Sequence, residues 1–211
     1  MIMTPTNPIF RRVLRSLQRV IYKGFFRHYY ERLFKAYGEG IVWGRLLSSP
    51  LIPRSIKIAC PENISIGDGC QFDEYTQLLA TPHSRLIIGK RVRFSNGFAH
   101  VTASFDTIEI EDDCLFGGFV LIINGNHGYE DIKTPIKYQE SYSTGPILIK
   151  AGSWIGRGAC IMGGVTIGRN SVVGANSVVT KSIPDYSMVV GNPAKVIKKY
   201  NFESKAWEKI T

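Results

Sequence analysis

One histidine lies at a point where a repeating pattern of aliphatic residues is interrupted. The segment VLIINGNHGYEDIKTP covers residues 120–135, and His127 stands within it among Asn and Gly residues. An imidazole exchanges a proton near neutral pH, so it can remove the proton of a hydroxyl group while that oxygen attacks an electrophile. No packing period requires a side chain at this position. His127 is therefore a candidate general base, and a solvated surface histidine is the alternative.

The three other histidines fit simpler roles. His28 lies among basic and aromatic residues, and His83 lies in the turn-like sequence TPHS, so we expect both at the protein surface. His100 falls near the first position of a six-residue series that runs from Ile88 through Phe94. That position predicts a structural histidine that faces inward or toward a corner of the fold.

A six-residue repeat defines the elements that must position these residues. From Ile149 the chain reads IKAGSW, IGRGAC, IMGGVT, IGRNSV, VGANSV and VTKSIP, so every first position is Ile or Val. Neither helical nor simple strand periodicity keeps this register, whereas a short strand followed by a sharp turn does. We expect the aliphatic side chain inside, a small fifth residue beside it, and Gly or Asn at positive φ in the turn.

The same repeat continues upstream in a looser form. Ile66, Ile88 and Ile110 are spaced by 22 residues, which is three hexads and four extra residues. From Ile110 to Ile149 the step is 39 residues, which is not a multiple of six. The discrepancy falls in residues 124–146, so we predict that this segment is a loop ejected from the solenoid.

The composition fits a soluble globular chain. Of the 211 residues, 44% are hydrophobic and 20% are charged, and no apolar run is long enough to predict a membrane-spanning helix. Arginines interrupt every candidate signal sequence. The four cysteines form no CxxC pair and have no metal-ligand spacing, and Cys70 and Cys114 take the small inward position of the repeat. Free structural thiols in a reducing cytosol are therefore expected.

The net charge of +9 is concentrated near the N-terminus. Residues 1–50 hold nine Lys or Arg and two acids, a net of +7, which leaves +2 for the rest of the chain. Residues 9–27 predict an amphipathic helix with an apolar face opposite an arginine-rich face. Such a helix can lie on an anionic membrane surface, and a solvated helix that caps the solenoid is the alternative. The basic stretch holds no recognised nucleic-acid-binding module, so no nucleic-acid partner is expected.

The hexads and the closing phrases VVTKSIP and GNPAKVIKK resemble the hexapeptide-repeat acyltransferases, over roughly residues 55–200. The resemblance implies an all-β solenoid, a left-handed parallel β-helix with an N-terminal helical segment and a short C-terminal helical tail. We expect these parts at residues 1–50, 51–193 and 194–211, and the solenoid to assemble as a homotrimer. The chain looks most like bacterial surface-polysaccharide O-acetyltransferases, which implies a cytoplasmic protein, peripheral on the inner face of the membrane, and an acceptor that is often lipid-linked.

The resemblance also implies roles for individual residues. His127 matches the family's general base, which activates a sugar hydroxyl to attack the thioester of acetyl-CoA without a metal or a covalent enzyme intermediate. Acceptor contacts are implied for Asn96, Asn124 and Asp106, and Phe105 stands where the family has an acceptor-binding acid.

Coenzyme contacts are implied for a second set of residues, namely Trp154, Arg157, Ala175, Thr180, Lys181 and Lys195. The last three would approach the nucleotide phosphates, for which cations and hydroxyls are natural ligands. Arg157 replaces a residue that is commonly small and polar in the family, so only its backbone N–H is expected to serve the thioester oxygen. Trp154 suits packing at a trimer interface equally well.

Two other functions remain compatible with the sequence, and a third lacks the residues it needs. An amino-sugar N-acetyltransferase would use the same cleft and a similar base. A zinc carbonic anhydrase of this fold needs two close histidines and a distant one, and the steps 83 to 100 and 100 to 127 do not supply them. A non-catalytic β-helix scaffold would bind no acetyl-CoA and would leave the loop histidine unexplained.

Overall fold

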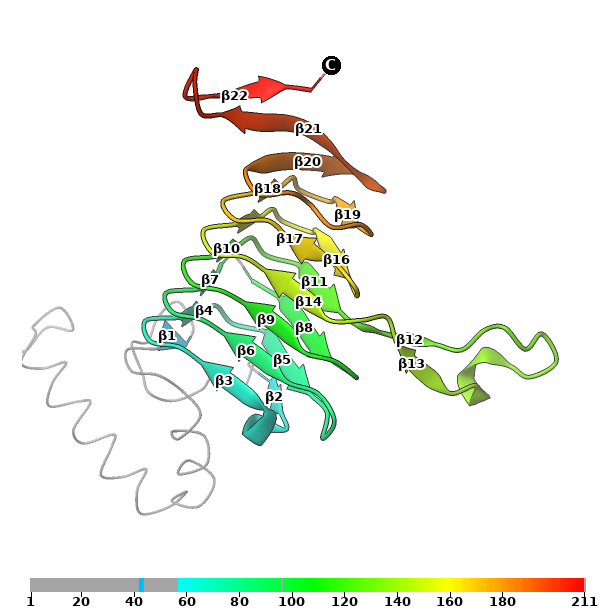
Figure 1. Cartoon of the computed structure of the whole chain (residues 1–211). Helices are drawn as coiled ribbons and strands as arrows, with labels where there is room; N and C mark the ends of the chain where they lie inside the picture. Colours follow the sequence, from blue (N-terminus) through cyan, green and yellow to red (C-terminus); the bar gives the residue numbers. More distant parts are fainter. Residues whose placement is uncertain (1–41, 44–56, 96, 211) are drawn as a thin grey trace, which may run out of the picture.

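The computed structural model describes residues 42–43, 57–95 and 97–210 (Figure 1). The amphipathic helix predicted within residues 9–27, His28 and the predicted acceptor residue Asn96 lie outside these ranges. The described residues form strands and two short 3₁₀ helices, η1 (Pro61–Asn63) and η2 (Ile136–Tyr138). No helix within these ranges has the length and apolar content needed to cross a membrane.

Three strand ladders wind into a prism. Sheet 1 contains β3 (Ile64–Ile66), β6 (Leu86–Ile88), β9 (Ile108–Ile110), β14 (Ile147–Ile149) and β17 (Thr166–Ile167). Sheet 2 contains β1 (Val42–Trp43), β4 (Gln71–Phe72), β7 (Arg93–Phe94), β10 (Leu115–Phe116), β15 (Trp154–Ile155), β18 (Val172–Val173), β20 (Ser187–Gly191), β21 (Ala194–Asn201) and β22 (Ala206–Lys209). Sheet 3 contains β2 (Lys57–Ala59), β5 (Thr76–Ala80), β8 (Ala99–Ala103), β11 (Val120–Ile123), β16 (Cys160–Met162) and β19 (Val178–Val179). Successive coils pair in parallel, which confirms the predicted parallel β-helix.

The aliphatic repeat sets the register between coils. One inward column in sheet 1 contains Ile66, Ile88, Ile110, Ile149 and Ile167, all of them buried. The adjoining column in sheet 2 begins with Phe72, Phe94 and Phe116, whose ring centroids are 5.4 and 4.3 Å apart. Each fully buried aliphatic or Phe side chain of this kind contributes about 1.5–3 kcal/mol. The columns explain the 22-residue spacing, because each step of 22 residues returns the chain to the same wall of the prism.

Sharp turns join the three walls. Positive φ occurs at the fourth residue of five successive hexads, Gly152, Gly158, Gly164, Asn170 and Asn176, which confirms the predicted use of Gly and Asn. We call the turns from sheet 2 to sheet 3 the 2/3 edge; it includes residues 95, 97–98, 117–119, 156–159 and 174–177. The turns from sheet 3 to the next sheet 1 strand form the 3/1 edge, which includes residues 104–107, 124–146 and 180–182.

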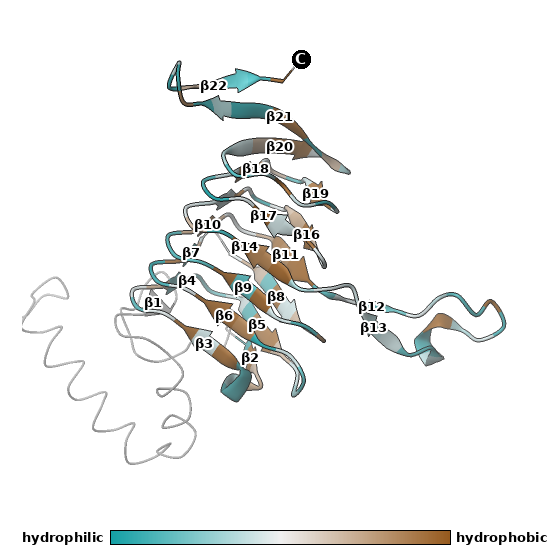
Figure 2. Ribbon diagram, viewed as in Figure 1, coloured by the Kyte–Doolittle hydropathy of each residue, from teal (hydrophilic) through white to brown (hydrophobic). Residues whose placement is uncertain are grey.

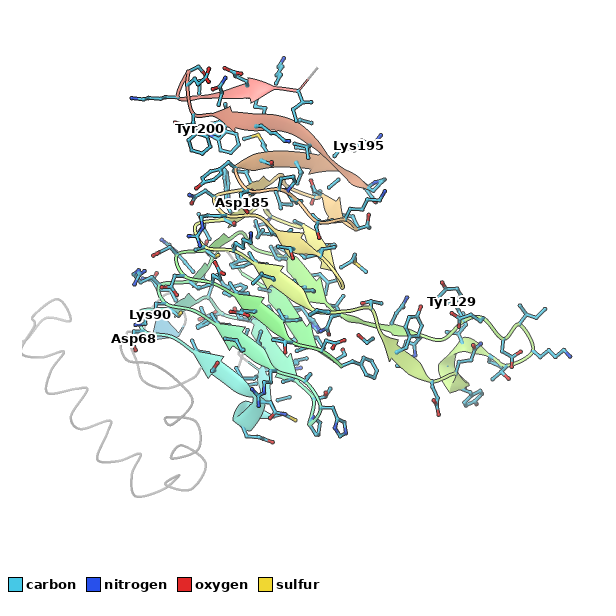
Figure 3. All side chains as sticks on the ribbon, in the orientation of Figure 1. Asp68, Lys90, Tyr129, Asp185, Lys195 and Tyr200 are labelled. Atoms are coloured by element: carbon cyan, nitrogen blue, oxygen red, sulfur yellow. The ribbon has the colours of Figure 1, made fainter. Side chains whose placement is uncertain are left out.

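The remaining edge, between sheets 1 and 2, is tied by ion pairs. Arg91 donates to both carboxylate oxygens of Asp113 in the next coil, at 2.6 and 2.7 Å. Higher up, the Nζ of Lys150 lies 3.1 Å from Asp185, which Figure 3 labels on this side of the prism. Arg91 and Asp113 both adopt positive φ, which is unusual for residues with a long or branched side chain. Their ion pair therefore connects two positive-φ turns of neighbouring coils.

The C-terminal tail is a strand ribbon, so the predicted helical tail is wrong. After β20, the strands β21 and β22 add to sheet 2 as an antiparallel hairpin (Figure 1). The last coil leaves the backbone groups of β20 without a parallel neighbour, and a further strand satisfies them. Val196, Ile197 and Tyr200 favour strand structure as well. Figure 2 shows the contrast between the apolar strands of the prism and the more polar ribbon that closes it.

Candidate active site

His127 lies on an arm that projects from the 3/1 edge (Figure 1). The strands β12 (Gly125–His127) and β13 (Ser141–Ser143) pair in antiparallel fashion at the base of the arm, with His127 directly opposite Ser141. The far part of the arm, where Figure 3 labels Tyr129, extends away from the prism. The break in the hexapeptide repeat therefore places an exposed histidine outside the packed solenoid.

The ring of His127 has one hydrogen-bond partner. The hydroxyl of Ser141 lies 3.1 Å from Nδ1. When Nδ1 carries the proton and donates it to Ser141, the lone pair of the imidazole is on Nε2. Within the part of the chain that the structure describes, no residue bonds to Nε2, which leaves this nitrogen open to a substrate when Nδ1 is the protonated one.

The root of the arm is held by a buried amide. Asn124 is 0% exposed; its Oδ1 accepts from the backbone N–H of Ser104 at 2.8 Å, and its Nδ2 donates to the carbonyl of Asp106 at 2.9 Å. The carboxylate of Asp106 accepts a hydrogen bond from the hydroxyl of Ser143. The structure thus brings two predicted acceptor residues to the arm root, where Asn124 is fully engaged and does not face a ligand. Both orient the arm that carries His127.

Gly125 is required where the arm leaves the prism. A Cβ at this position would lie 2.7 Å from the Cβ of Ser104 and 3.2 Å from the ring of Phe105. Real side chains do not tolerate the first of these distances, so a larger residue would push the arm outward. Phe105, which stands where the family has an acid, therefore contacts the base of the arm.

His100 faces outward, so the inward or corner-facing role predicted for it is wrong. In β8 the side chains of Ala99 and Val101 enter the core, and strand alternation places His100 and Thr102 on the outer face of sheet 3. The Nε2 of His100 lies 2.5 Å from the hydroxyl of Thr102, and burial lowers the pKa of this imidazole. His100 is thus a half-buried histidine on an outer face, an orientation that the hexad position did not reveal.

Three of the predicted coenzyme residues follow the 2/3 edge. Arg157 and Ala175 occupy successive turns, and a Cβ on Gly156, which precedes Arg157, would lie only 2.7 Å from the backbone nitrogen of Ala175. Lys195 pairs with Val190 at the top of the same edge, where Figure 3 shows it at the turn between β20 and β21. The guanidinium of Arg157 lies 4.4 Å from the centroid of the Phe119 ring. Arg157 and Ala175 are thus exposed on this edge, whereas Gly156 is buried between the coils.

The other predicted coenzyme residues lie elsewhere on the prism. Trp154 projects from the outer face of sheet 2 between Leu115 and Val172 and is 50% exposed. Thr180 and Lys181 follow β19 and are exposed at the 3/1 edge. The structure therefore does not gather the six predicted residues on one edge of a single chain.

Sheet 3 separates the arm from the 2/3 edge. Its strands contain two to five residues, and at about 3.3 Å per residue a five-residue strand spans roughly 16 Å. His127 lies at one side of this wall, whereas Arg157 and Ala175 lie at the other. One chain alone does not place its arm histidine beside its own 2/3 edge.

Sequence reasoning missed two residues of this arrangement. Ser141 lies 14 positions after His127, and only the antiparallel pairing of the arm brings the two together. Phe119, which stacks against Arg157, has positive φ in a turn where the repeat predicts Gly or Asn. Neither position has a signal in the hexapeptide pattern, because both depend on departures from it.

The fold and the arm define the class of protein: this chain is a hexapeptide-repeat β-solenoid with an ejected arm. Residues 146–181 match the family described as bacterial transferase hexapeptide (six repeats). A protein of Escherichia coli K12 named lipopolysaccharide biosynthesis O-acetyl transferase WbbJ is 37% identical over 120 residues, which cover 54% of this chain and 61% of that protein. The chain thus spans less than two thirds of this relative. The predicted resemblance to hexapeptide-repeat acyltransferases is confirmed.

Solved structures share the fold. The N-acyltransferase AntD from Bacillus cereus, in complex with dTDP and coenzyme A, matches with a TM-score of 0.60 at 21% identity, over 80% of this chain and 85% of that chain. A maltose O-acetyltransferase from Clostridium difficile 630 matches with a TM-score of 0.50 at 26% identity, over 90% of this chain and 85% of that chain. The similarity to AntD shows a shared fold and nothing more.

Proposed function

We propose that this protein transfers an acetyl group from acetyl-CoA to a sugar hydroxyl in the biosynthesis of a surface polysaccharide. The observation that carries the proposal is the exposed His127, oriented by Ser141 on an arm that interrupts a hexapeptide solenoid. The relative named for lipopolysaccharide O-acetylation and the maltose O-acetyltransferase of the same fold support a hydroxyl acceptor.

His127 acts as the general base in this proposal. Its Nε2 takes the proton of the sugar hydroxyl while the oxygen forms a bond to the thioester carbonyl carbon. The carbon–sulfur bond then breaks, and the imidazolium returns the proton to the departing thiolate, which gives an acetyl ester and coenzyme A. Such proton transfer contributes about 10²–10⁴-fold in rate, or about 3–5 kcal/mol.

The 2/3 edge is the proposed path of the coenzyme. The exposed Ala175 has a small side chain that leaves room for a ligand beside its turn, and the backbone N–H of Arg157 is the proposed donor to the thioester oxygen. Lys195 supplies positive charge at the upper end of this path, where phosphates would lie.

A complete site needs two copies of the chain. The arm histidine, Thr180 and Lys181 lie at the 3/1 edge, whereas the proposed coenzyme path follows the 2/3 edge. A trimer of parallel prisms would place the 3/1 edge of one copy beside the 2/3 edge of the next. The proposed homotrimer therefore accounts for the separation of the predicted site residues within one chain.

Contact with an anionic membrane is proposed from the sequence of residues 9–27. An amphipathic basic helix there would keep a cytoplasmic protein at the inner face of the membrane, where lipid-linked acceptors are held. Loss of binding to anionic vesicles after deletion of residues 1–27, with activity on a soluble acceptor retained, would support this contact.

The decisive experiment is a screen of acetyl-CoA consumption against nucleotide sugars, free oligosaccharides and lipid-linked saccharides. The product of any active acceptor is then treated with hydroxylamine, which cleaves acetyl esters and leaves acetamides intact. Release of the acetyl group supports the O-acetyltransferase. A resistant product identifies the amino-sugar N-acetyltransferase, the fold's other known chemistry among the similar structures. A protein that binds no acetyl-CoA would be the non-catalytic scaffold.

A further inference from the structure

The C-terminal ribbon carries a charge arrangement that its own packing does not explain. In the pairing of β21 with β22, Lys198 lies directly opposite Lys209. Like charges at directly opposed positions destabilise an antiparallel strand pair. Among the described residues, neither ammonium group has an ion-pair partner. On the other face of the same ribbon Lys199 lies opposite Glu208, so opposite charges are matched there.

The lysine pair shares its face with aromatic side chains. Tyr200 lies opposite Trp207, one alternation along from the lysines, so all four side chains project to the same side. The two ring centroids are 5.7 Å apart with an interplanar angle of 71°. Phe202 extends the cluster at 5.2 Å from Tyr200 and is 64% exposed. Figure 3 shows Tyr200 on this ribbon at the end of the prism.

This face continues the outer face of sheet 2. Met188 lies beside Lys198 in the next strand, and the row continues through Val172 to Trp154. Neighbouring strands are about 4.8 Å apart, so Lys198 lies about 14 Å from Trp154 along the row. The residues between them are apolar. A ligand whose anionic end lies at the lysines thus has an apolar surface beside it on the outer face of sheet 2.

We propose that the outer face of the β21–β22 ribbon is a phosphate-binding site. Lys198 and Lys209 donate to the phosphate oxygens, and Tyr200 and Trp207 contact the group that the phosphate carries. Two adjacent ammonium groups match a phosphomonoester, which carries about −1.5 to −2 charge at pH 7. The bound anion also removes the repulsion between the lysines. Two lysines directly opposite each other break the charge preference of strand pairs. Such a departure is expected at a functional site, where a bound anion neutralises the two charges.

The same phosphate chemistry has two sources. The nucleotide end of the coenzyme is one, and this assignment rests on the proposed function. The headgroups of an anionic lipid surface are the other. Direct binding of inorganic pyrophosphate depends on neither, so its result is independent of whether the protein transfers an acetyl group.

The test compares the full-length chain with the double variant Lys198→Gln/Lys209→Gln by titration calorimetry with inorganic pyrophosphate at low salt. We expect the double variant to bind about tenfold more weakly or worse, because two charge-assisted hydrogen bonds are lost. The matched control Lys199→Gln/Lys205→Gln removes the same charge from other positions of the ribbon and should bind as the wild type does. Equal binding by the wild type and the double variant, or equal loss in the control, would overturn the proposal, as would a wild type that does not bind pyrophosphate.

Folding of the variant is checked by its melting temperature. Because the substitution relieves repulsion between two lysines, the melting temperature should equal or exceed that of the wild type. A lower melting temperature would show that the lysines stabilise the ribbon, which contradicts the claim that they repel each other without a ligand.

Two further measurements identify the source of the phosphate. A double variant that binds coenzyme A more weakly, but still sediments with phosphatidylglycerol vesicles as the wild type does, assigns the site to the coenzyme. Reduced sedimentation with unchanged coenzyme A binding assigns it to the lipid surface. If neither binding falls, the ribbon has no phosphate ligand of these kinds and the proposal is rejected.

Discussion

At the scale of single residues, the proposed chemistry depends on one imidazole and on the hydroxyl that holds its ring. The hydroxyl of Ser141 lies 3.1 Å from the Nδ1 of His127 across the base of the arm, and Nε2 can accept a proton when Nδ1 is the protonated nitrogen. A histidine that is exposed but oriented suits a base that must meet a substrate from outside the fold. The catalytic competence of His127 therefore depends on a partner that lies 14 residues away in the chain.

The first prediction concerns this partner. Ser141→Ala should lower kcat by about tenfold, less than removal of the base itself, because the imidazole remains but its tautomer and orientation are no longer held. The KM for acetyl-CoA should stay unchanged, since Ser141 is not among the residues proposed to contact the coenzyme. Steady-state kinetics measures both values, and Ser141→Thr, which keeps the hydroxyl, should restore kcat. A Ser141→Ala enzyme with wild-type kcat would show that Ser141 does not orient the base.

Asn124 supports the arm from within the prism. Both ends of its amide bond to backbone groups, so Asn124→Ala leaves the N–H of Ser104 and the carbonyl of Asp106 without these partners. Each buried polar group that loses its partner costs about 1–3 kcal/mol. We predict a loss of stability of at least this size, measured by denaturant unfolding. The exposed Asn126→Ala should change stability by less than about 0.5 kcal/mol. Equal stability of the two variants would contradict the role of Asn124.

At the scale of secondary-structure elements, the regular solenoid was predictable from the sequence. The arm was only partly predictable, and the C-terminal ribbon was not. The hexads from Ile149 and the 22-residue steps from Ile66 correspond directly to columns of the core, because each aliphatic position must return to the same wall. The sequence also located the break that becomes the arm. The sequence did not reveal that Asn124 is buried, because an asparagine in a predicted loop can bind either a ligand or the backbone.

The C-terminal ribbon was predicted wrongly for a physical reason. The segment AKVIKK has helix-forming lysines and too few residues to show a clear period. Its structure depends on the exposed backbone of β20, which a local pattern does not describe. The same limitation applies to His100. Strand β8 begins with the buried Ala99, so strand alternation turns His100 outward, and the hexad count does not show where the strand begins.

The edge between sheets 1 and 2 leads to a prediction about pH. Arg91 holds the pKa of the Asp113 carboxyl below its usual value through a bidentate hydrogen bond. Because the folded pKa is depressed, the contribution to stability is present above the unfolded value of about 3.9 and is lost as the pH falls through the folded value. The effect is small because both side chains are more than half exposed.

We therefore expect Arg91→Gln to melt slightly below the wild type at neutral pH. The difference should begin to shrink below about pH 4, where Asp113 becomes protonated in the unfolded state, and should vanish once the pH is below the depressed folded value. Melting curves at several pH values measure it. A difference that grows in acid would mean that Arg91 stabilises the fold by some means other than this ion pair.

At the scale of the whole molecule, the proposed site is shared between copies. We predict that His127→Ala and Ala175→Trp, each inactive alone, regain activity when the two variants are co-expressed and form mixed trimers. In a cyclic trimer with random mixing, about one quarter of the sites combine an intact arm with an intact neighbouring edge, so activity should approach about one quarter of the wild-type value. Activity that stays absent in mixed trimers would place the complete site within one chain.

The central claim is that the histidine in the broken repeat is the base. Its most direct test is the turnover of His127→Ala beside that of His100→Ala, the other histidine on an outer face, with acetyl-CoA binding and assembly measured for both. Because His127 lies outside the solenoid, we expect its variant to keep its assembly and its affinity for acetyl-CoA while kcat falls by about 10²–10⁴. His100→Ala should retain turnover. Near-normal turnover of His127→Ala, with turnover abolished in a folded His100→Ala, would contradict the account.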